Sequence, residues 1–387
     1  MSGTTLPWQP PGGSAPSSVI PSITIVLNGT DITDTIAIER LSYSEATGGE
    51  VPTFQIDVQD IDRRWQNFGF TLGSDTIVGT LGWQGGQSWT TGTFTVDELA
   101  LSTPPDVFSV MAVEAGLNNA IRTRNSVAYE GKTLTEIAQS VAARHGMTAV
   151  TAAVNPDPVF QRVTQRMETD ISFLLRLAHE HNYDFTIRDN QLIFFSRPSL
   201  EAQAVTGPVL TRQMLRTQAR CRRQGLGELT YKQATVAYFN PYDKRLFTGQ
   251  ALDPTLQVAD THKAVVRVEN GQQASLKAQS NLWTANMRST GIAFPLVGTL
   301  NYRAGNTVNI QGFGLWDRNT YLVQRVEVEI TPEQGFVTTL ELRTITSLSG
   351  DTQMIASQAD IAASPNTENS EAVQEAGAIP TTASNLG

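Results

Sequence analysis

The sequence predicts a mainly β protein, in which two antiparallel β domains, each a sandwich or a barrel, flank a small α/β insert. Short runs of alternating apolar and polar residues, bounded by Gly, Pro or Asn, occur before residue 122 and again after residue 206. Two capped helical patterns lie between these regions. The composition agrees, because only 17% of the residues are charged and Thr, Ser, Gln and Gly are frequent, as in many β-rich chains.

Both ends of the chain have the composition of extended segments. Residues 1–21 are rich in Pro, Gly and Ser, and residues 347–387 are rich in Ser, Ala, Thr, Glu and Asn. Such segments bury too little apolar surface to fold alone. We therefore expect an N-terminal arm and a C-terminal tail whose isolated apolar residues contact partner proteins. The candidate partner-interface residues are Leu6, Trp8, Met354 and Ile355.

The first β domain is expected over residues 22–122. Apolar and polar residues alternate over residues 23–27, and Asn28-Gly29 directly afterwards is a strong signal for a two-residue hairpin turn. Similar alternations recur along this region between Gly-Gly and Pro-Pro pairs, and no long helical period interrupts them. This pattern is typical of an antiparallel sandwich or barrel.

Residues 123–205 predict the α/β insert. Thr133 and Glu136 have the spacing of a capping box, in which each side chain satisfies the backbone amide of the other residue. An apolar stripe follows and ends at Gly146, where a left-handed C-terminal cap is expected. The first helix of the insert therefore spans about three turns from Thr133 onwards.

The second helix of the insert begins near Thr169 or Asp170, because either side chain can accept a hydrogen bond from the first free amides. Apolar residues at i, i+3, i+4 and i+7 give it one buried face. Asn182 stands at the position of a left-handed cap. We expect His179 and His181 in the last turn to balance the helix dipole with positive charge.

A hairpin is predicted directly after this helix. Residues 183–187 alternate between apolar and polar, and an apolar run returns at residues 192–195. Between them, Asp189-Asn190 can adopt the positive φ angles of a two-residue turn. The unit is therefore a helix followed by strand, turn and strand.

The second β domain is expected over residues 206–346. Strand patterns bounded by Gly, Pro or Asn recur in this region, and residues 273–288 have one apolar helical face with Gly291 beyond the end. The sequence thus predicts a β domain with one packed helix.

Composition excludes several classes of protein. The formal net charge of -9 argues against a protein that binds duplex DNA or an anionic membrane, since both would favour basic patches. A single cysteine forms no intrachain disulfide, and the sequence holds no run of about 18 apolar residues that would insert in a membrane. We found no signal-peptide pattern at the N-terminus and expect synthesis in a cytoplasm.

No arrangement of residues indicates catalysis, a metal or a cofactor. His179 and His181 are two positions apart and point to opposite sides of a helix, with no third ligand near them in the sequence. Cys221 lies among arginines, including Arg220 and Arg222, which could lower its pKa. A basic strand is favoured over a reactive thiol, because no histidine partner is evident.

Carboxylates at Asp57, Asp60 and Asp62 could form a glycosidase pair, but turn chemistry is favoured because such loops are common. The sequence therefore predicts that the protein is not an enzyme. One binding alternative stays open: residues 129–147 resemble the first helix of a peptidoglycan-binding LysM module, although a clear second half is missing.

Two motifs resemble those of the phage late control D family, the baseplate hub proteins of contractile-tailed phages, which are related to the hub part of VgrG spike proteins. The first motif, at residues 168–185, reads ETDISFLLRLAHEHNYDF and precedes the predicted hairpin. The second motif extends over residues 298–342 and includes GTLNYRAGNTVNIQG, YLVQRVEVEI and GFVTTLEL. The two motifs lie more than a hundred residues apart and follow the expected order.

The resemblance implies that the two β domains are tube-like and that three copies form a homotrimer. In that family, three chains present six similar β units, so that a pseudo-sixfold ring meets the hexameric tail tube and a threefold face meets the trimeric central spike. The ring encloses a channel for genomic DNA, and we predict that its wall is acidic and does not bind DNA specifically.

The same resemblance implies the partners and the location. The expected partners are a second and third copy of the chain, the tail tube or a tube-initiator protein, the central spike, wedge proteins and the tape measure, without membrane insertion. The expected location is the tail baseplate of a virion, or of a related contractile injection system such as a tailocin, assembled in the cytoplasm of a bacterial host.

Overall fold

The computed structural model describes residues 20–114, 123–154, 156–188, 190–197, 199, 209–223, 231–241, 244–253, 260–286, 290–299 and 301–344. Most of the two terminal segments falls outside these ranges. The four predicted partner-interface residues, Leu6, Trp8, Met354 and Ile355, therefore lie outside the described residues, and their role stays a prediction.

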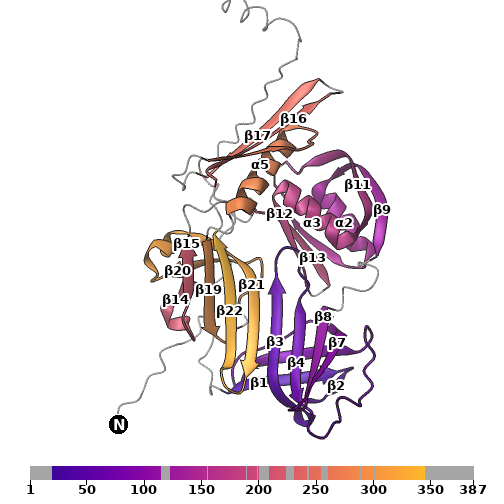
Figure 1. Ribbon diagram of the computed structural model, residues 1–387, viewed down its shortest axis with the longest axis vertical. Coiled ribbons are helices and arrows are strands. Elements are labelled where there is room, and N and C mark those ends of the chain that lie inside the picture. Colours follow the sequence, from indigo (N-terminus) through magenta and orange to yellow (C-terminus); the bar gives the residue numbers. More distant parts are fainter. Residues whose placement is uncertain are drawn as a thin grey trace, which may run out of the picture.

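The N-terminal region supplies the first half of a large sheet (Figure 1). Its strands are β1 (Pro21–Leu27), β2 (Thr30–Asp31), β3 (Ala37–Ala46), β4 (Thr53–Gln59), β5 (Thr76–Trp83), β6 (Ser88–Thr90), β7 (Phe94–Ser102) and β8 (Val107–Glu114). A short 3-10 turn, η1, covers Thr33–Thr35. Asn28 and Gly29 both have positive φ and connect β1 to β2, which confirms the hairpin predicted from this dipeptide.

The C-terminal region supplies the second half of the same sheet. Its strands are β14 (Leu210–Thr211), β15 (Arg220–Arg223), β19 (Thr290–Val297), β20 (Thr307–Gln311), β21 (Thr320–Thr331) and β22 (Gly335–Thr344). Two 3-10 turns, η2 (Arg212–Met214) and η4 (Gly314–Arg318), complete the region.

The two halves join through antiparallel pairing of β21 with β3, which places Arg325 opposite Ala46 and Ile330 opposite Leu41. The described strands thereby form one 14-stranded sheet with the main order β15-β19-β22-β21-β3-β4-β8-β7-β5-β1-β2. One continuous apolar core contains side chains from both halves, including Phe54 and Phe294. The mainly β class with an α/β insert is confirmed, and the sheets are not closed barrels.

The α/β insert lies beside this sheet (Figure 1). Its elements are β9 (Arg124–Thr133), α2 (Leu134–Arg144), β10 (Thr148–Ala152), β11 (Val159–Thr169), α3 (Asp170–His181), β12 (Tyr183–Arg188) and β13 (Gln191–Ser196). Strands β10, β13 and β12 form one small sheet, and β11 pairs with β9. The two helices and these strands enclose a separate core of large apolar side chains such as Phe173, Leu177 and Phe194.

The caps of both helices match the sequence signals. Thr133 and Glu136 form the complete capping box of α2. At α3 the cap is Thr169, whose hydroxyl accepts a hydrogen bond from the Ser172 amide at 3.1 Å. The Asp170 side chain does not cap the helix but accepts hydrogen bonds from Arg144 and Gln165. Asn182 ends α3 in the left-handed region, with φ 62° and ψ 38°.

The predicted hairpin after α3 is present. Arg188 pairs with Gln191 across β12 and β13, which leaves a two-residue turn. Asn190 has a φ of 56° there, as the turn requires. Asp189, the other turn residue, lies outside the described residues.

The structure contains a third unit, which the sequence patterns did not distinguish from the second β domain. Strands β16 (Gln233–Asn240), β17 (Arg245–Leu252) and β18 (Thr261–Val265) form their own three-stranded sheet. Helix α5 (Gly271–Asn286), predicted at residues 273–288, packs on this small sheet and against α3 (Figure 1). We call β16, β17, β18 and α5 the α5 unit. The predicted domain boundaries stay predictions.

Candidate functional site

The face of the large sheet that is turned away from its apolar core is polar across the β21–β3 junction. We call it the outer face. Along each strand, its residues alternate with buried ones such as Leu41, Ile56 and Val328. The outer-face residues near the junction are Ser42, Gln55, Asp57, Glu327, Glu329 and Thr339.

Charges of both signs occur on the outer face. Arg40 donates to Glu329 across the junction at 2.8 Å, and Arg325 forms ion pairs with Glu50 and Glu341. Because these pairs are partly exposed, each contributes little to stability. The Arg40–Glu329 and Arg325–Glu50 pairs both cross the junction between the two halves of the sheet.

A buried carboxylate ties the junction to the insert. Glu45, at the end of β3, is only 2% exposed and accepts hydrogen bonds from the Tyr43 hydroxyl and the Ala304 amide, both at 2.7 Å. The guanidinium groups of Arg303 and Arg188 lie 3.6 and 3.9 Å from its oxygens. Since these partners come from both halves of the sheet and from β12, Glu45 joins three parts of the fold.

The approach of the insert at this point requires a glycine. The amides of Gly48 and Gly49 both donate to the Phe185 carbonyl, at 3.1 and 3.0 Å. Gly49 has a φ of 73°, and a Cβ there would lie 2.6 Å from the Phe185 ring. A side chain at this position would therefore separate the insert from the sheet.

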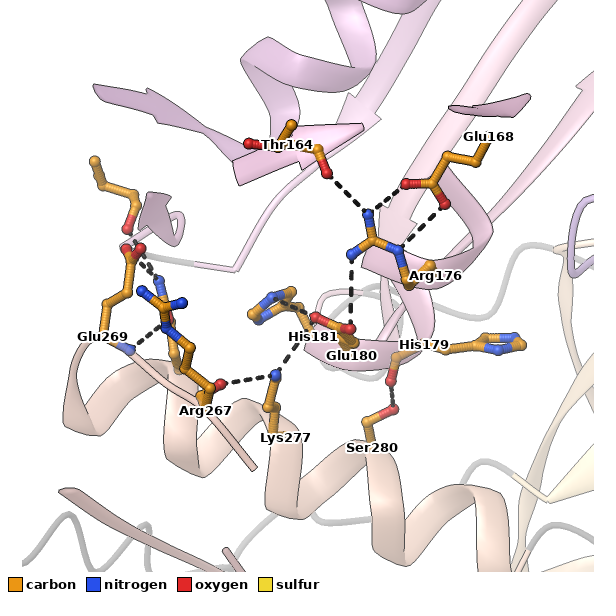
Figure 2. Close-up of polar contacts among 12 residues, drawn as sticks. Thr164, Glu168, Arg176, His179, Glu180, His181, Arg267, Glu269, Lys277 and Ser280 are labelled. Atoms are coloured by element: carbon orange, nitrogen blue, oxygen red, sulfur yellow. Dashed lines mark hydrogen bonds and ion pairs between the residues drawn. The ribbon is translucent and has the colours of Figure 1, made fainter. Parts of the chain in front are cut away.

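A charged groove runs between the insert and the α5 unit (Figure 2). It encloses about 1030 Å³ and is lined by side chains of β11, α3 and α5. Arg176 contacts Glu168 at 2.6 Å and Glu180 at 3.8 Å. Lys277 of α5 contacts Glu180 at 3.4 Å and donates to the Arg267 carbonyl at 3.1 Å, so the two units are linked by charge.

The two histidines of α3 do not carry the positive charge expected from the sequence. Burial, reinforced by the nearby Lys277 and Arg176, lowers the pKa of His181 to about 3. Burial, reinforced by Arg197, also lowers the pKa of His179. Both imidazoles are therefore neutral near pH 7, and the helix-dipole interpretation is wrong. Within the described ranges, no group of three or more His, Cys, Asp and Glu side chains could hold a metal ion.

The alternative of a reactive thiol at Cys221 is also wrong. Burial raises the pKa of Cys221, and the opposing effect of Arg212 is smaller. Its side chain packs against the core of the large sheet, since Cys221 pairs with the buried Ile292. Arg220 and Arg222 pair with residues of the other face, as expected for a basic strand.

The predicted turn chemistry is confirmed for Asp60 and Asp62, whereas Asp57 lies in strand β4 and accepts a hydrogen bond from the Gln55 side chain at 2.9 Å. Asp60 accepts hydrogen bonds from the amides of Trp65 and Gln66, at 2.8 and 2.9 Å. Burial alone would raise the pKa of Asp60, but these hydrogen bonds outweigh it and hold the pKa below its usual range. Asp62 likewise accepts from the Arg64 amide at 3.3 Å.

A buried carboxylate that links several elements of the insert was not predicted from the sequence. Asp170 is fully buried and accepts hydrogen bonds from Arg144 at 2.8 Å, His145 at 2.6 Å and Gln165 at 2.7 Å. Burial alone would raise its pKa, but these donors lower it. The only signal in the sequence was an acidic residue in the first turn, which is equally typical of a cap.

No helix in the described part of the chain is both long and apolar enough to cross a membrane.

No family model matches the sequence. Relatives do match. The probable baseplate hub protein of Escherichia phage 186 is 27% identical over 188 residues, which cover 48% of this chain and 47% of that protein. The probable baseplate hub protein of Escherichia phage P2 is 25% identical over 182 residues, covering 46% of each.

The chain thus spans about half the length of the curated relatives that it matches. Among solved structures, the 43 kDa tail protein of prophage MuSo2 from Shewanella oneidensis has a similar fold, with a TM-score of 0.65 and 13% identity over 84% of this chain and 99% of that one. Relatives described as hub proteins and a shared tail-protein fold confirm the resemblance of this chain to the baseplate hub proteins of contractile-tailed phages.

Proposed function

We propose that this protein is the structural hub of a contractile-tail baseplate and has no enzymatic role. The observation that carries the proposal is the joining of two β regions in one open sheet with a polar outer face. An open sheet leaves strand edges for further copies, and a polar face suits the wall of a water-filled channel. The similarity to hub proteins of two phages supports the same role.

The proposed assembly is a homotrimer. Each chain contributes two β regions to one sheet, so three chains supply six such regions around a threefold axis. One side of such a ring has approximate sixfold symmetry and fits a hexameric tail tube or tube-initiator protein. The other side keeps the threefold symmetry and fits a trimeric central spike.

The channel would let genomic DNA pass without specific binding. The acidic channel wall expected from the hub resemblance stays a prediction, and the outer face carries arginines such as Arg40 and Arg325 as well as carboxylates. Tight binding of duplex DNA by the purified trimer at physiological salt would contradict a non-binding wall, because phosphate binding needs unpaired cations.

The terminal segments would serve as contacts to other tail proteins. In this proposal Leu6, Trp8, Met354 and Ile355 anchor the arm and the tail on the spike, the tube, wedge proteins or the tape measure. The protein would be located in the tail baseplate of a virion or of a related injection machine, after assembly in the cytoplasm of the host.

Light scattering of the purified chain, alone and co-expressed with its spike and tube proteins, tests the proposal. A mass of three times the 42.1 kDa of one chain is the expected result. A chain that remains monomeric and binds neither the spike nor the tube would overturn it.

The peptidoglycan-binding alternative gains no support from the fold. Strands β10 and β11 follow α2, where the second half of a LysM-like unit would have to begin. A pull-down on purified peptidoglycan tests this alternative, which stays a prediction.

A further inference from the structure

The charged groove between the insert and the α5 unit is long enough to hold an extended segment of chain. Its hollow of about 1030 Å³ continues into a second hollow of about 730 Å³, and the two share four lining residues, among them Arg176 and Lys277. Along α5 the combined wall reaches from Gln273 to Ala285, which is a rise of about 18 Å. An extended strand of about six residues covers this length.

The first hollow of the groove is basic, although the whole chain has a net charge of -9. Its lining contains five cationic side chains and three carboxylates. All three carboxylates, Glu168, Glu180 and Glu269, already have partners within the protein. Among the described residues, the exposed guanidinium groups of Arg166 and Arg267 have no hydrogen-bond or ion-pair partner. Arg166 belongs to β11 and Arg267 directly precedes α5, so a bound anion would meet unpaired positive charge from both units.

Two histidines in the wall of the groove each have a ring nitrogen without a partner. His181 is 1% exposed, lines the first hollow, and its Nδ1 has no hydrogen-bond partner among the described residues. Figure 2 shows its ring extending from α3 toward Arg267. The buried Nδ1 of His262, in the wall of the second hollow, also has no such partner. Because an unpaired buried nitrogen costs free energy, an occupant with polar side chains is favoured here.

The C-terminal tail has the composition that such a groove would bind. No Lys or Arg follows Arg343 in the chain, whereas five carboxylates do, and three of these lie within residues 368–375, which read ENSEAVQE. The same eight residues include Asn369, Ser370 and Gln374, whose side chains can each donate and accept hydrogen bonds. Residues 368–375 thus combine negative charge with the polar groups that the two histidines lack.

The tail begins beside the end of α5. Ile292 pairs with Leu342 across β19 and β22. Two positions beyond this pair in the same direction lie Thr290, the first residue of β19, and Thr344, the last residue of β22. The last residue of α5, Asn286, is four positions before Thr290, so their Cα atoms lie within about 15 Å of each other. Figure 1 shows α5 next to this end of the large sheet, so the tail starts near the wall of the second hollow.

We infer that residues 368–375 bind in the charged groove of their own chain and hold the insert and the α5 unit together. We call this contact the tail clasp. It goes beyond the proposed hub function and does not depend on it. Residues 345–367 connect the clasp to β22 and can extend over about 75 Å, which exceeds the length of the groove several times. Because the tether keeps the segment at an effective concentration on the order of millimolar, modest charge contacts are sufficient for binding.

A spin label in the tail of the full chain tests the clasp. The label is attached to Ser370→Cys in a Cys221→Ala background, and its motion is measured by electron paramagnetic resonance on the purified protein without other tail proteins. A slowly moving label is expected at low salt. About 1 M NaCl is expected to make it move fast, because salt screens exposed charges.

Charge reversal identifies the contacts of the labelled segment. The tail variant replaces its three carboxylates with lysine, at Glu368, Glu371 and Glu375. This variant is expected to lose the slow motion, and so is the groove variant, Arg166→Glu with Arg267→Glu. All five substitutions together are expected to restore it.

A matched control changes the same amount of charge outside the groove. Lys132→Glu with Lys263→Glu alters one exposed residue of the insert and one of the α5 unit, and neither residue lines the groove. The label is expected to keep its slow motion in this control. The tail variant keeps the test falsifiable if the groove variant fails to fold, since it leaves the groove side chains in place.

A disulfide test distinguishes binding within one chain from binding between chains. Thr284 is exposed and lines the second hollow, at the end of α5 where the tail would enter. In a Cys221→Ala background, Thr284→Cys combined with Thr367→Cys is expected to form a disulfide within one chain on mild oxidation. The product keeps the mass of a single chain on a denaturing gel. Covalent dimers and trimers would overturn the assignment to the chain's own groove.

The remaining outcomes separate the clasp from the hub proposal. A label that moves fast in the purified wild type overturns the clasp, even if added spike or tube proteins then slow it, because the tail would bind a partner instead. Slow motion that survives both charge-reversal variants overturns it as well. Light scattering of the same samples tests the hub independently, since the clasp does not require a trimer.

Discussion

The α/β insert and the α5 unit lie side by side but are stabilised in different ways. The insert has a core of large side chains, including Phe173, Phe185 and Phe194, around its two amphipathic helices. The buried core of the α5 unit consists mainly of small residues, such as Ala234, Ala274 and Ala278. The first unit therefore depends on side-chain volume, and the second depends on close approach of the backbone.

Helix α5 also buries many polar side chains, because it is covered on two sides. One side packs on β16 and β17, and the other meets α3, where Gln279 accepts from Asn182 at 3.4 Å and Lys277 contacts Glu180. At the end of the helix, Asn286 exchanges hydrogen bonds with the backbone of Tyr231. Buried polar groups are tolerated when they are paired in this way.

The largest expected effect tests the charge network of the insert. Asp170→Ala removes the buried carboxylate that pairs with Arg144 and His145. We therefore expect the free energy of unfolding to fall by about 3–5 kcal/mol. Urea unfolding monitored by circular dichroism measures this loss. Asp34→Ala, at an exposed position, is the control and should change stability by less than about 0.5 kcal/mol. Equal effects would contradict the network.

A glycine of β17 tests the close packing of the α5 unit. A Cβ at Gly249 would lie 2.2 Å from the Ala274 carbonyl carbon and 2.3 Å from the Ser275 nitrogen. Gly249→Ala is therefore expected to destabilise the protein by about 1–3 kcal/mol through overpacking. Gly271→Ala is the matched control, since no atom lies within 4 Å of its added methyl group. If both variants unfold at the same urea concentration, the packing argument fails.

The groove between the two units gives stability a pH dependence. The pKa of His181 is about 3 in the folded protein and near 6.5 in the unfolded chain, so the unfolded state binds the extra proton first as the pH falls. The contribution of His181 is complete above pH 6.5 and decreases by about 1.4 kcal/mol per pH unit between 6.5 and 3.

His181→Gln removes this titration, so its unfolding free energy should depend less on pH than that of the wild type between pH 6.5 and 4.5. Lys277, Arg176 and Glu180 surround the imidazole and stay in place in the variant (Figure 2). Parallel pH profiles of the two proteins would show that His181 is not the titrating group.

The smallest expected effects are those of substitutions at the helix caps of the two units. Thr133 caps α2, and Asn270 accepts a hydrogen bond from the Gln273 amide at 2.8 Å at the start of α5. Thr133→Ala and Asn270→Ala should each lower the unfolding free energy by about 1 kcal/mol. Thr133→Ser and Asn270→Ser retain a capping oxygen and should recover most of it. A serine variant no better than alanine would contradict the capping role.

The same contrast explains which elements could be predicted from the sequence. The helices of the insert were predicted closely, because Thr133, Thr169 and Asn182 are local signals that act within one helical turn. Helix α5 was located from its apolar face, but its contact with α3 was not predicted, because that contact is made by polar side chains such as Gln279 and Lys277.

Charge states and long-range pairings were beyond the sequence patterns. The neutrality of His181 depends on burial beneath the α5 unit, which the local pattern of α3 does not contain. The meeting of Glu45 with Arg303, and of β3 with β21, joins segments that no periodicity relates. The resemblance to hub proteins was visible in two sequence motifs, whereas the pairing of strands across the large sheet was visible only in the structure.

The β21–β3 junction also orders events during translation. Ser44 and Arg325 bond across it although they are 281 positions apart in the chain, which gives this sheet a high contact order. The N-terminal β region leaves the ribosome long before β21 exists, and during that interval the edge of β3 is exposed. A chain truncated before residue 320 would keep that edge permanently open and be prone to aggregate. Strand β21, which is synthesised long after β3, is thus the strand that protects the edge of β3.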